Sequence, residues 1–289
     1  MNPPAGKISP EDLVKDISGL VTLPDVYLRI NRLVDDPNSS STDIARAVSQ
    51  DASFTVKLLK LANSALYSFP STVDTVAKAV TIIGTAQVRS LALSLSVASS
   101  FEGLPNDLVS MRNFWKHSLL CALAARQLCK EARRCDADAL FTAGLLHDIG
   151  ELIIFNRLPA QAKEALLTVL HNQEEVTVSE AEDQTIGFSH TDVGGALARQ
   201  WNLPDLLQEC IAFHHAPAKA RKHPREVALI HIANSLAQLA EVDSLELDDA
   251  PPIDPAAWQT TGLGPDIVES VVQAAQEAFD EIEQLFLGQ

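Results

Sequence analysis

The sequence predicts an all-α fold, in which a smaller helical N-terminal subdomain precedes a multi-helix bundle. Three observations favour this class. Apolar residues recur at intervals of three and four along most of the 289-residue chain, which is the period of a helix with one buried face. Ser, Thr and Asp precede several of these segments as candidate N-caps. No segment alternates apolar and polar residues as a half-buried strand would.

The first half of the chain predicts a series of short helices. Ser9–Asp12 combines an N-cap, a proline at the first helical position and early acids. Asp51 caps a second helix, Thr75 opens a third that Gly84 ends, and Thr85 caps a fourth. The apolar faces of the last three consist of Phe54, Leu58, Leu61, Ala62 and Ala65; Ala79, Val80 and Ile83; and Val88, Leu91, Ala92 and Leu95.

A domain boundary is predicted near residue 105, because Phe101–Asp107 (FEGLPND) is rich in helix breakers. All eight histidines follow this point. We expect an N-terminal subdomain over residues 8–104, a histidine-bearing bundle over 105–247, and a linker with an acidic C-terminal helix over 248–289, all within a single module. The apolar side of that last helix consists of Ile267, Val271, Ala275, Ala278, Ile282 and Leu285.

Charge and composition exclude several classes. The net charge is −16, and the segment from Glu241 to Gln289 holds twelve acids and no Lys or Arg, which predicts a solvated helix face. Nucleic-acid binding is not expected, because it draws its affinity from basic residues. A helix-turn-helix around Gly84 is a weak alternative for the same reason, since Val73–Val97 carries only one acid and two bases.

The start MNPPAGK has no apolar signal region, and the weakly polar run Ser90–Phe101 is too short to span a membrane. We therefore expect a cytoplasmic protein without a membrane partner. The cysteines fit no zinc-finger spacing and are interpreted as reduced thiols. They are Cys121, Cys129, Cys135 and Cys210.

His147 and Asp148 lie side by side within the apolar run Gly144–Phe155 (GLLHDIGELIIF). This run resembles a core helix, and a buried carboxylate there needs a partner, either a hydrogen-bond network or a metal. Imidazoles with a carboxylate suit iron, manganese, zinc or nickel, and one carboxylate can bridge two ions. We expect one or two divalent ions, with a metal-free polar network as the alternative. Further candidates on other predicted helices are His117, His190, His214, His215 and Asn234.

Several motifs together resemble the HD phosphohydrolase superfamily. They are Gly144–Gly150 (GLLHDIG), Glu182, His190–Gly194 (HxxxG), Trp201–Pro204 (WNLP) and Phe213–His215 (FHH). In the first half, Leu23–Tyr27, Asp51–Tyr67 and Ala79–Arg89 narrow the resemblance to the HDOD family, the HD-related output domain of bacterial signalling proteins. The resemblance covers roughly residues 10–240 and implies an all-helical fold with a role in signal transduction.

The related HD-GYP phosphodiesterases, which cleave cyclic di-GMP, imply a ligand set. By that resemblance one metal position consists of His117, His147 and Asp148, and the other of Asp148, His190, His214 and His215. Asn234 replaces the last carboxylate of the pattern, Glu151 replaces a lysine that suits phosphate, and no GYP-like segment follows His215. Glu182, Asn234 and Glu151 are assigned to the surroundings of the metal, and no catalytic residue is assigned.

Two functions remain open at this point. The favoured one is a signalling protein with a degenerate metal site, which acts by protein–protein interaction on a signalling partner in trans, because no receiver or output domain is recognisable. The alternative is a metal-dependent phosphohydrolase acting on a nucleotide such as a cyclic dinucleotide. Asn63 and Ser64 are interpreted as a buried polar pair bonded to backbone, or as the place where the two halves or a partner meet.

Overall fold

The computed structural model describes residues 8–17, 23–64, 66–67, 69, 72–101, 108–133, 135–171 and 176–287. Throughout these ranges the secondary structure is helical, without a strand, so the predicted all-α class is confirmed. The boundary segment at residues 102–107, the start MNPPAGK and Ala65 lie outside the described residues.

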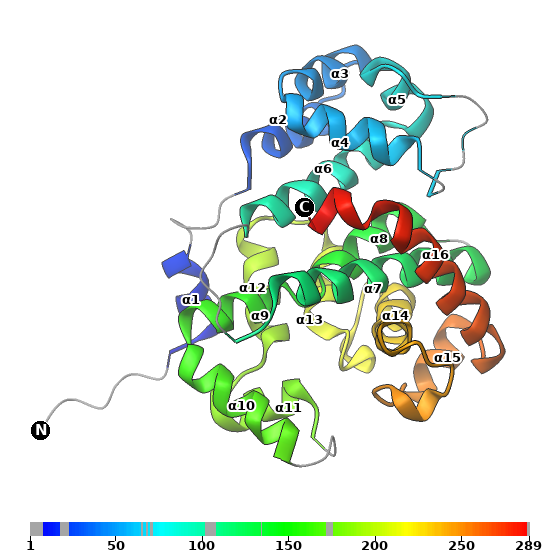
Figure 1. Ribbon diagram of the computed structural model, residues 1–289. Helices are drawn as coiled ribbons and strands as arrows, with labels where there is room; N and C mark the ends of the chain where they lie inside the picture. The colour runs from blue at the N-terminus through cyan, green and yellow to red at the C-terminus, as the bar shows by residue number, and fades with distance from the viewer. Residues whose placement is uncertain are drawn as a thin grey trace, which may run out of the picture.

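The N-terminal lobe is formed by short helices that lie together at the top of Figure 1, with the longer α6 beneath them. Local signals define their ends as predicted: the side chains of Asp51 and Thr75 accept hydrogen bonds from the N–H groups of Phe54 and Lys78. Gly84 ends α5 at a φ of 96°, which glycine adopts without strain. The helices are α2 (Asp25–Asp35), α3 (Ser41–Ser49), α4 (Ala52–Ala62), α5 (Val76–Ile83) and α6 (Thr85–Ser100).

The second half is a bundle around α7, which crosses the middle of the molecule and packs against α8, α14 and α16 (Figure 1). Helix α1 (Pro10–Ile17) packs against α9 and α12 of this bundle, although it precedes the N-terminal lobe in sequence. The helices are α7 (Met111–Ala132), α8 (Ala137–Leu146), α9 (Ile149–Arg157), α10 (Pro159–His171), α11 (Val178–Thr185), α12 (His190–Gln200), α13 (Asp205–Phe213), α14 (Pro224–Val242), α15 (Pro255–Thr261) and α16 (Val268–Leu287). Three 3₁₀ turns connect them within the described residues, η1 (Pro217–Lys219), η2 (Leu247–Asp249) and η3 (Pro265–Ile267).

Glycines bring two pairs of helices of the bundle into backbone contact. A Cβ on Gly144 would lie 2.7 Å from the Ala122 Cα, so α8 packs directly on α7. A Cβ on Gly150 would lie 2.0 Å from the His190 carbonyl oxygen and 2.7 Å from the Gly194 N, so α9 packs directly on α12. The glycines of GLLHDIG and HxxxG therefore set the spacing of the helices that carry the candidate ligands.

A cluster of polar side chains, here called the inter-lobe latch, joins the end of the N-terminal lobe to the bundle. It consists of Tyr67, Arg126 on α7 and Asp138 on α8. The Tyr67 hydroxyl donates to Asp138 Oδ1 at 3.1 Å, and Arg126 pairs with the same carboxylate. Arg126 also donates to the Leu66 carbonyl at 2.8 Å and stacks over the Tyr67 ring. The segment after α4 is thus tied to α7 and α8 of the bundle.

The neighbouring Asn63 closes the loop that follows α4. Its amide donates to the Val73 carbonyl and accepts from the Val73 N–H, both at 2.8 Å. Backbone partners therefore satisfy this side chain as expected, although Asn63 is exposed rather than buried. Ser64 donates to the Leu61 carbonyl at 2.7 Å.

Among the described residues, no single helix combines the length and apolar content needed to cross a membrane. The bent pair Val76–Ile83 and Thr85–Ala98 passes on length and composition alone, with a 113° bend between its two helices.

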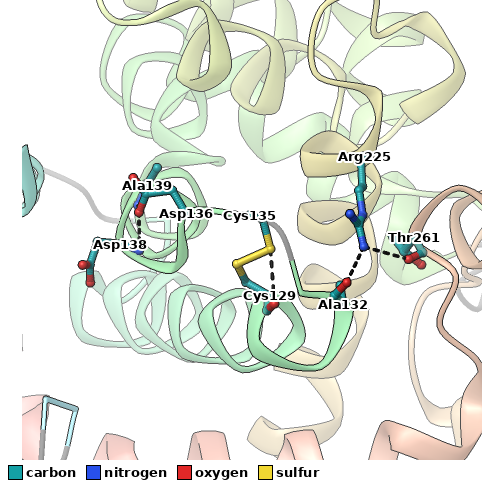
Figure 2. Close-up of a disulfide and its surroundings, with 8 residues drawn as sticks. All are labelled: Cys129, Ala132, Cys135, Asp136, Asp138, Ala139, Arg225 and Thr261. Carbon is teal, nitrogen blue, oxygen red and sulfur yellow. Dashed lines mark hydrogen bonds between the residues drawn. A yellow bond between two sulfur atoms is a disulfide. The ribbon is translucent and has the colours of Figure 1, made fainter.

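The prediction of four reduced cysteines is wrong for two of them. Cys129 and Cys135 form a disulfide (Figure 2). Cys121 and Cys210 are free and buried. The compositional rule failed because it contains no information on distance: the turn between α7 and α8 brings the two Cα atoms within 5.8 Å.

Candidate metal centre

The HD doublet lies at a break between two helices rather than inside one. Helix α8 ends at Leu146 and α9 begins at Ile149, with Asp148 as its N-cap residue. The Asp148 side chain makes no capping bond to α9. Its carboxylate is therefore free to face the interior of the bundle. In a continuous helix the same side chain would point in a different direction.

Three buried histidines are fixed in the same tautomer by hydrogen bonds at Nδ1. His147 bonds to the Gly144 carbonyl at 2.8 Å and His214 to the Ile211 carbonyl at 3.0 Å. His190 bonds to Glu182 at 2.7 Å. Because a carbonyl oxygen can only accept, Nδ1 carries the proton in the first two rings, and each Nε2 presents a lone pair.

The Nε2 atoms of these rings converge on Asp148. They lie 2.9 Å from Oδ2 for His147, and 3.2 Å and 3.5 Å from Oδ1 for His214 and His190. All three Nε2 atoms and Asp148 Oδ1 are buried without a hydrogen-bond partner. Lone pairs that face a carboxylate repel it, so the cluster requires a cation, either protons or a metal ion.

His215 adds a fourth imidazole from the solvent side. It follows His214 after the end of α13 and is exposed. Its ring centroid lies 4.2 Å from that of His214 and 5.1 Å from that of His190. One ligand atom from each of Asp148, His190, His214 and His215 lies within 4.8 Å of the others, which suits a single divalent ion.

His117 approaches Asp148 from α7 but is already engaged. Its Nε2 lies 3.8 Å from Asp148 Oδ2 and 2.8 Å from Asn234 Oδ1, while Nδ1 lies 3.1 Å from Glu241 Oε2. His117, His147 and Asp148 form a second compact donor set. A metal at this position would have to compete with Asn234 for the His117 nitrogen.

The protonation states follow from burial and from neighbouring charges. Burial disfavours the charged form of His190, but Glu182 outweighs it and raises the pKa of His190 to about 10. Burial lowers the pKa of His214 to about 4. Burial also opposes the charge on Asp148, yet His147 and His214 hold the pKa of Asp148 well below its usual range. The carboxylate is thus ionised, and protons occupy some of the ring nitrogens when no metal does.

Two acids assigned to the surroundings of the metal lie beside this set. The Glu182 carboxylate accepts from both the backbone N–H and Nδ1 of His190, each at 2.7 Å, and so orients that ring. Glu151 lies near Glu182 and His190. Burial, followed by the charge of Asp148, raises the pKa of Glu151 to about 8.

Sequence reasoning missed two residues of the centre. Glu241 was counted with the solvated acidic tail, yet it is partly buried against His117. His231 bonds through Nδ1 to the His214 carbonyl at 2.7 Å, and its Nε2 accepts from the Asp254 N–H at 2.9 Å. Glu241 was detectable, because it follows Asn234 by two helical turns on α14; nothing local signalled the role of His231.

Comparisons with known proteins agree with this architecture. The family model of the HDOD domain matches residues 20–217. An uncharacterised protein of Treponema pallidum is 26% identical over 223 residues, which is 75% of this chain and 42% of that protein. This chain therefore spans less than half the length of that curated relative.

Solved structures give the same fold at low identity. An HDOD domain protein of unknown function from Geobacter sulfurreducens superposes with a TM-score of 0.74 at 24% identity, over 94% of this chain and 97% of that one. A proposed metal-dependent phosphohydrolase from Shewanella amazonensis gives a TM-score of 0.61 at 23% identity, over 92% and 95%. A proposed signal transduction protein from Marinobacter aquaeolei gives 0.71 at 22% identity, over 96% of this chain and 61% of that one. With the family match covering more than half of its length, the chain belongs to the HDOD domain family.

Proposed function

We propose that this HDOD protein is a cytoplasmic bacterial signalling module, which binds a divalent metal ion and acts on a partner protein through its surface. The ion is iron, manganese, zinc or nickel, and its role is structural: it holds the bundle together rather than driving fast turnover.

One observation carries the metal part of this proposal. Three imidazole nitrogens and a carboxylate oxygen are buried without partners and point at one another. Native interiors rarely leave such groups unsatisfied. Imidazole Nε2 atoms whose Nδ1 atoms are bonded to a carbonyl or carboxylate have the orientation that metal-ligating histidines have.

Each residue has a definite task in this centre. Asp148, His190, His214 and His215 would hold the first ion to bind, and Glu182 orients His190. A divalent ion at such a site supplies Lewis acidity and compensates negative charge. His117, held by Asn234 and Glu241, keeps the second position weak, so a single ion is favoured.

Electrostatics argue against efficient phosphoester hydrolysis. Phosphoryl transfer needs positive groups where negative charge develops. Here the histidines of the cluster are already paired with the carboxylates of Asp148, Glu182 and Glu241, so they are not free positive groups for a substrate. Glu151 stands where the related enzymes have lysine, and its carboxyl group, with a pKa raised to about 8, supplies no positive charge. An anionic substrate therefore meets repulsion that one metal ion only partly offsets.

The partner is proposed to dock in trans on the N-terminal lobe. Three helices of this lobe expose one large apolar side chain each, Leu28 on α2, Val56 on α4 and Ile82 on α5. A contiguous surface formed by such side chains would be typical of a protein-binding site.

The metal is tested by elemental analysis of tag-free protein. Wild type should hold close to one equivalent of a transition metal, and Asp148→Ala should lose it, because the carboxylate is central to both donor sets. Asp183→Ala removes an exposed carboxylate on α11 and should retain the metal. Full metal content in Asp148→Ala would contradict the assignment.

The role is tested in a deletion strain complemented with variants, with the transcript profile as readout. His147→Ala combined with Asp148→Ala should restore most of the profile if the protein remains folded, whereas Val56→Glu should not. The second candidate, a phosphohydrolase, is favoured by the two donor sets that share Asp148. Nucleotide hydrolysis by the metal-loaded wild type, lost together with complementation in the folded double variant, would establish the enzyme instead.

A further inference from the structure

Cys129 and Cys135 join the end of one helix to the start of the next. Cys129 lies in the last turn of α7, and Cys135 immediately precedes Asp136, the N-cap residue of α8. Figure 2 shows the disulfide between them, bordered by the Asp136 cap on one side and by Arg225 on the other.

The two sulfur atoms differ in environment. Cys129 is buried at 3% exposure, at the C-terminal end of α7, whereas Cys135 is partly exposed. Cys135 stands at the N-terminal end of the ten-residue helix α8 and follows two arginines in sequence. Cys135 is therefore the cysteine that reacts with a small disulfide from solution, and Cys129 is the cysteine that then displaces the small thiol from the mixed disulfide.

Hydrogen bonds hold the turn in addition to the S–S bond. Asp136 accepts from the N–H groups of Asp138 and Ala139 at 3.0 Å and 3.1 Å. Arg225 donates to the carbonyls of Ala132 and Thr261 (Figure 2). These bonds do not involve the sulfur atoms, so they remain available after reduction, although the start of α8 then loses one covalent restraint.

The reduced form also has a hydrogen-bond partner in place. Cys135 Sγ lies 3.2 Å from the Cys129 carbonyl oxygen, which can accept from the thiol once the sulfur carries a proton. Neither state therefore requires refolding of the turn, which is the condition for reversible interconversion.

We propose that Cys129 and Cys135 form a reversible dithiol–disulfide site, which exchanges with low-molecular-weight disulfides such as oxidised glutathione. The chain is predicted to be cytoplasmic, where protein disulfides are transient and typical of redox sensing. The site lies apart from the histidine cluster and does not depend on the proposed metal.

The exchange balances in two steps. The Cys135 thiolate attacks one sulfur of the small disulfide, forms a mixed disulfide and releases one thiolate. The Cys129 thiolate then attacks Cys135 Sγ, closes the protein disulfide and releases the second thiolate. The protein loses two electrons and two protons, and the small disulfide gains both to become two thiols.

The state of this site is coupled to the inter-lobe latch. Asp138, which binds Tyr67 and Arg126, lies in the first turn of α8, two residues after the Asp136 cap. The disulfide restricts the start of that helix, so reduction increases the opening of the latch. The redox signal would thereby reach the contact between the N-terminal lobe and the bundle.

The test equilibrates full-length protein in glutathione buffers of graded ratio, followed by differential alkylation and peptide mass spectrometry. Cys129 and Cys135 should change together with a two-electron dependence, while Cys121 and Cys210 remain unmodified in the folded protein. Hydrogen exchange at the start of α8 and at Leu66–Tyr67 should be about tenfold faster in the reduced form.

Two variants give the controls. Cys135→Ser should abolish the redox dependence of exchange, and Asp138→Asn should show fast exchange in both redox states, because the latch is already weakened. The proposed site is rejected if both thiols are alkylated in every buffer, or if the bond is reduced only after unfolding. The coupling is rejected if exchange is the same in both redox states of the wild type.

Discussion

Gly150→Ala tests whether α9 and α12 must touch for the centre to form. The added Cβ would lie 2.0 Å from the His190 carbonyl oxygen, whereas real Cβ contacts stay above 3.0 Å. The helices would have to separate by about 1 Å, and the opposing atoms belong to backbone, which yields little. Overpacking costs about 1–3 kcal/mol, and rigid backbone places this site at the upper end.

The better helix propensity of alanine offsets about 1 kcal/mol of this strain, which leaves a net destabilisation of about 2 kcal/mol. That corresponds to a Tm lowered by about 4–8 °C. Gly195→Ala is the matched control on α12: its nearest neighbours are the side chains of Ala212 and Arg199, at 3.0 Å and 3.3 Å. Its free energy of unfolding should change by less than about 1 kcal/mol.

Urea denaturation of chelator-treated protein, followed by circular dichroism, measures both variants without metal. Zinc titration then measures the centre, where Gly150→Ala should also weaken binding, because the displaced carbonyl belongs to His190, one of the proposed ligands. Equal stability of Gly150→Ala and wild type would refute the close packing. An equal loss of unfolding free energy in Gly150→Ala and Gly195→Ala would refute the argument that a clash with backbone costs more than a clash with side chains.

Three further predictions concern the centre itself. Glu182→Gln should weaken zinc binding by about 10–100-fold in chelator competition, or about 1.4–2.7 kcal/mol, whereas the exposed Glu180→Gln should not. Asn234→Asp should raise metal content from one ion towards two in elemental analysis; unchanged content would show that residue 234 does not face the metal. Without metal, the protonated His190 stabilises the fold, because its pKa rises from 6.5 to about 10. This stabilisation is complete below about pH 6.5 and is lost as the pH rises through 10, so the urea midpoint should fall between pH 7 and 10 and should fall less in Glu182→Gln.

Most of the fold was predictable because its signals are local. Asp51 and Thr75 mark the starts of α4 and α5, and Gly84 marks the end of α5. All three act through contacts within a few residues, which the sequence displays directly. The break at His147 and Asp148 was not predictable in this way. Apolar residues continue on both sides of it, and what orients the carboxylate is the contact of α9 with α12, more than forty positions along the chain.

The candidate site was predictable in part for a related reason. The motif histidines come together around Asp148 as the resemblance implied, while Glu241 and the disulfide were misjudged from composition. An acidic residue in an acidic tail resembles a solvated one, and only the packing of α14 on α7 brings Glu241 to His117. Two cysteines six residues apart carry no distance information until the turn between α7 and α8 is known.

His231 links two parts of the molecule that the family match separates. The match ends at residue 217, but this imidazole connects the carbonyl of His214, a proposed metal ligand, to the backbone N–H of Asp254, in the segment before α15. If His214 holds the proposed metal, metal affinity and the position of that segment are thermodynamically linked, and linkage is reciprocal. A partner protein that binds the C-terminal helices and displaces Asp254 must change the affinity for the metal by a certain factor. The metal must then change the affinity for that partner by the same factor. The metal content of the protein would then report the presence of such a partner, without any contact between the partner and the histidines.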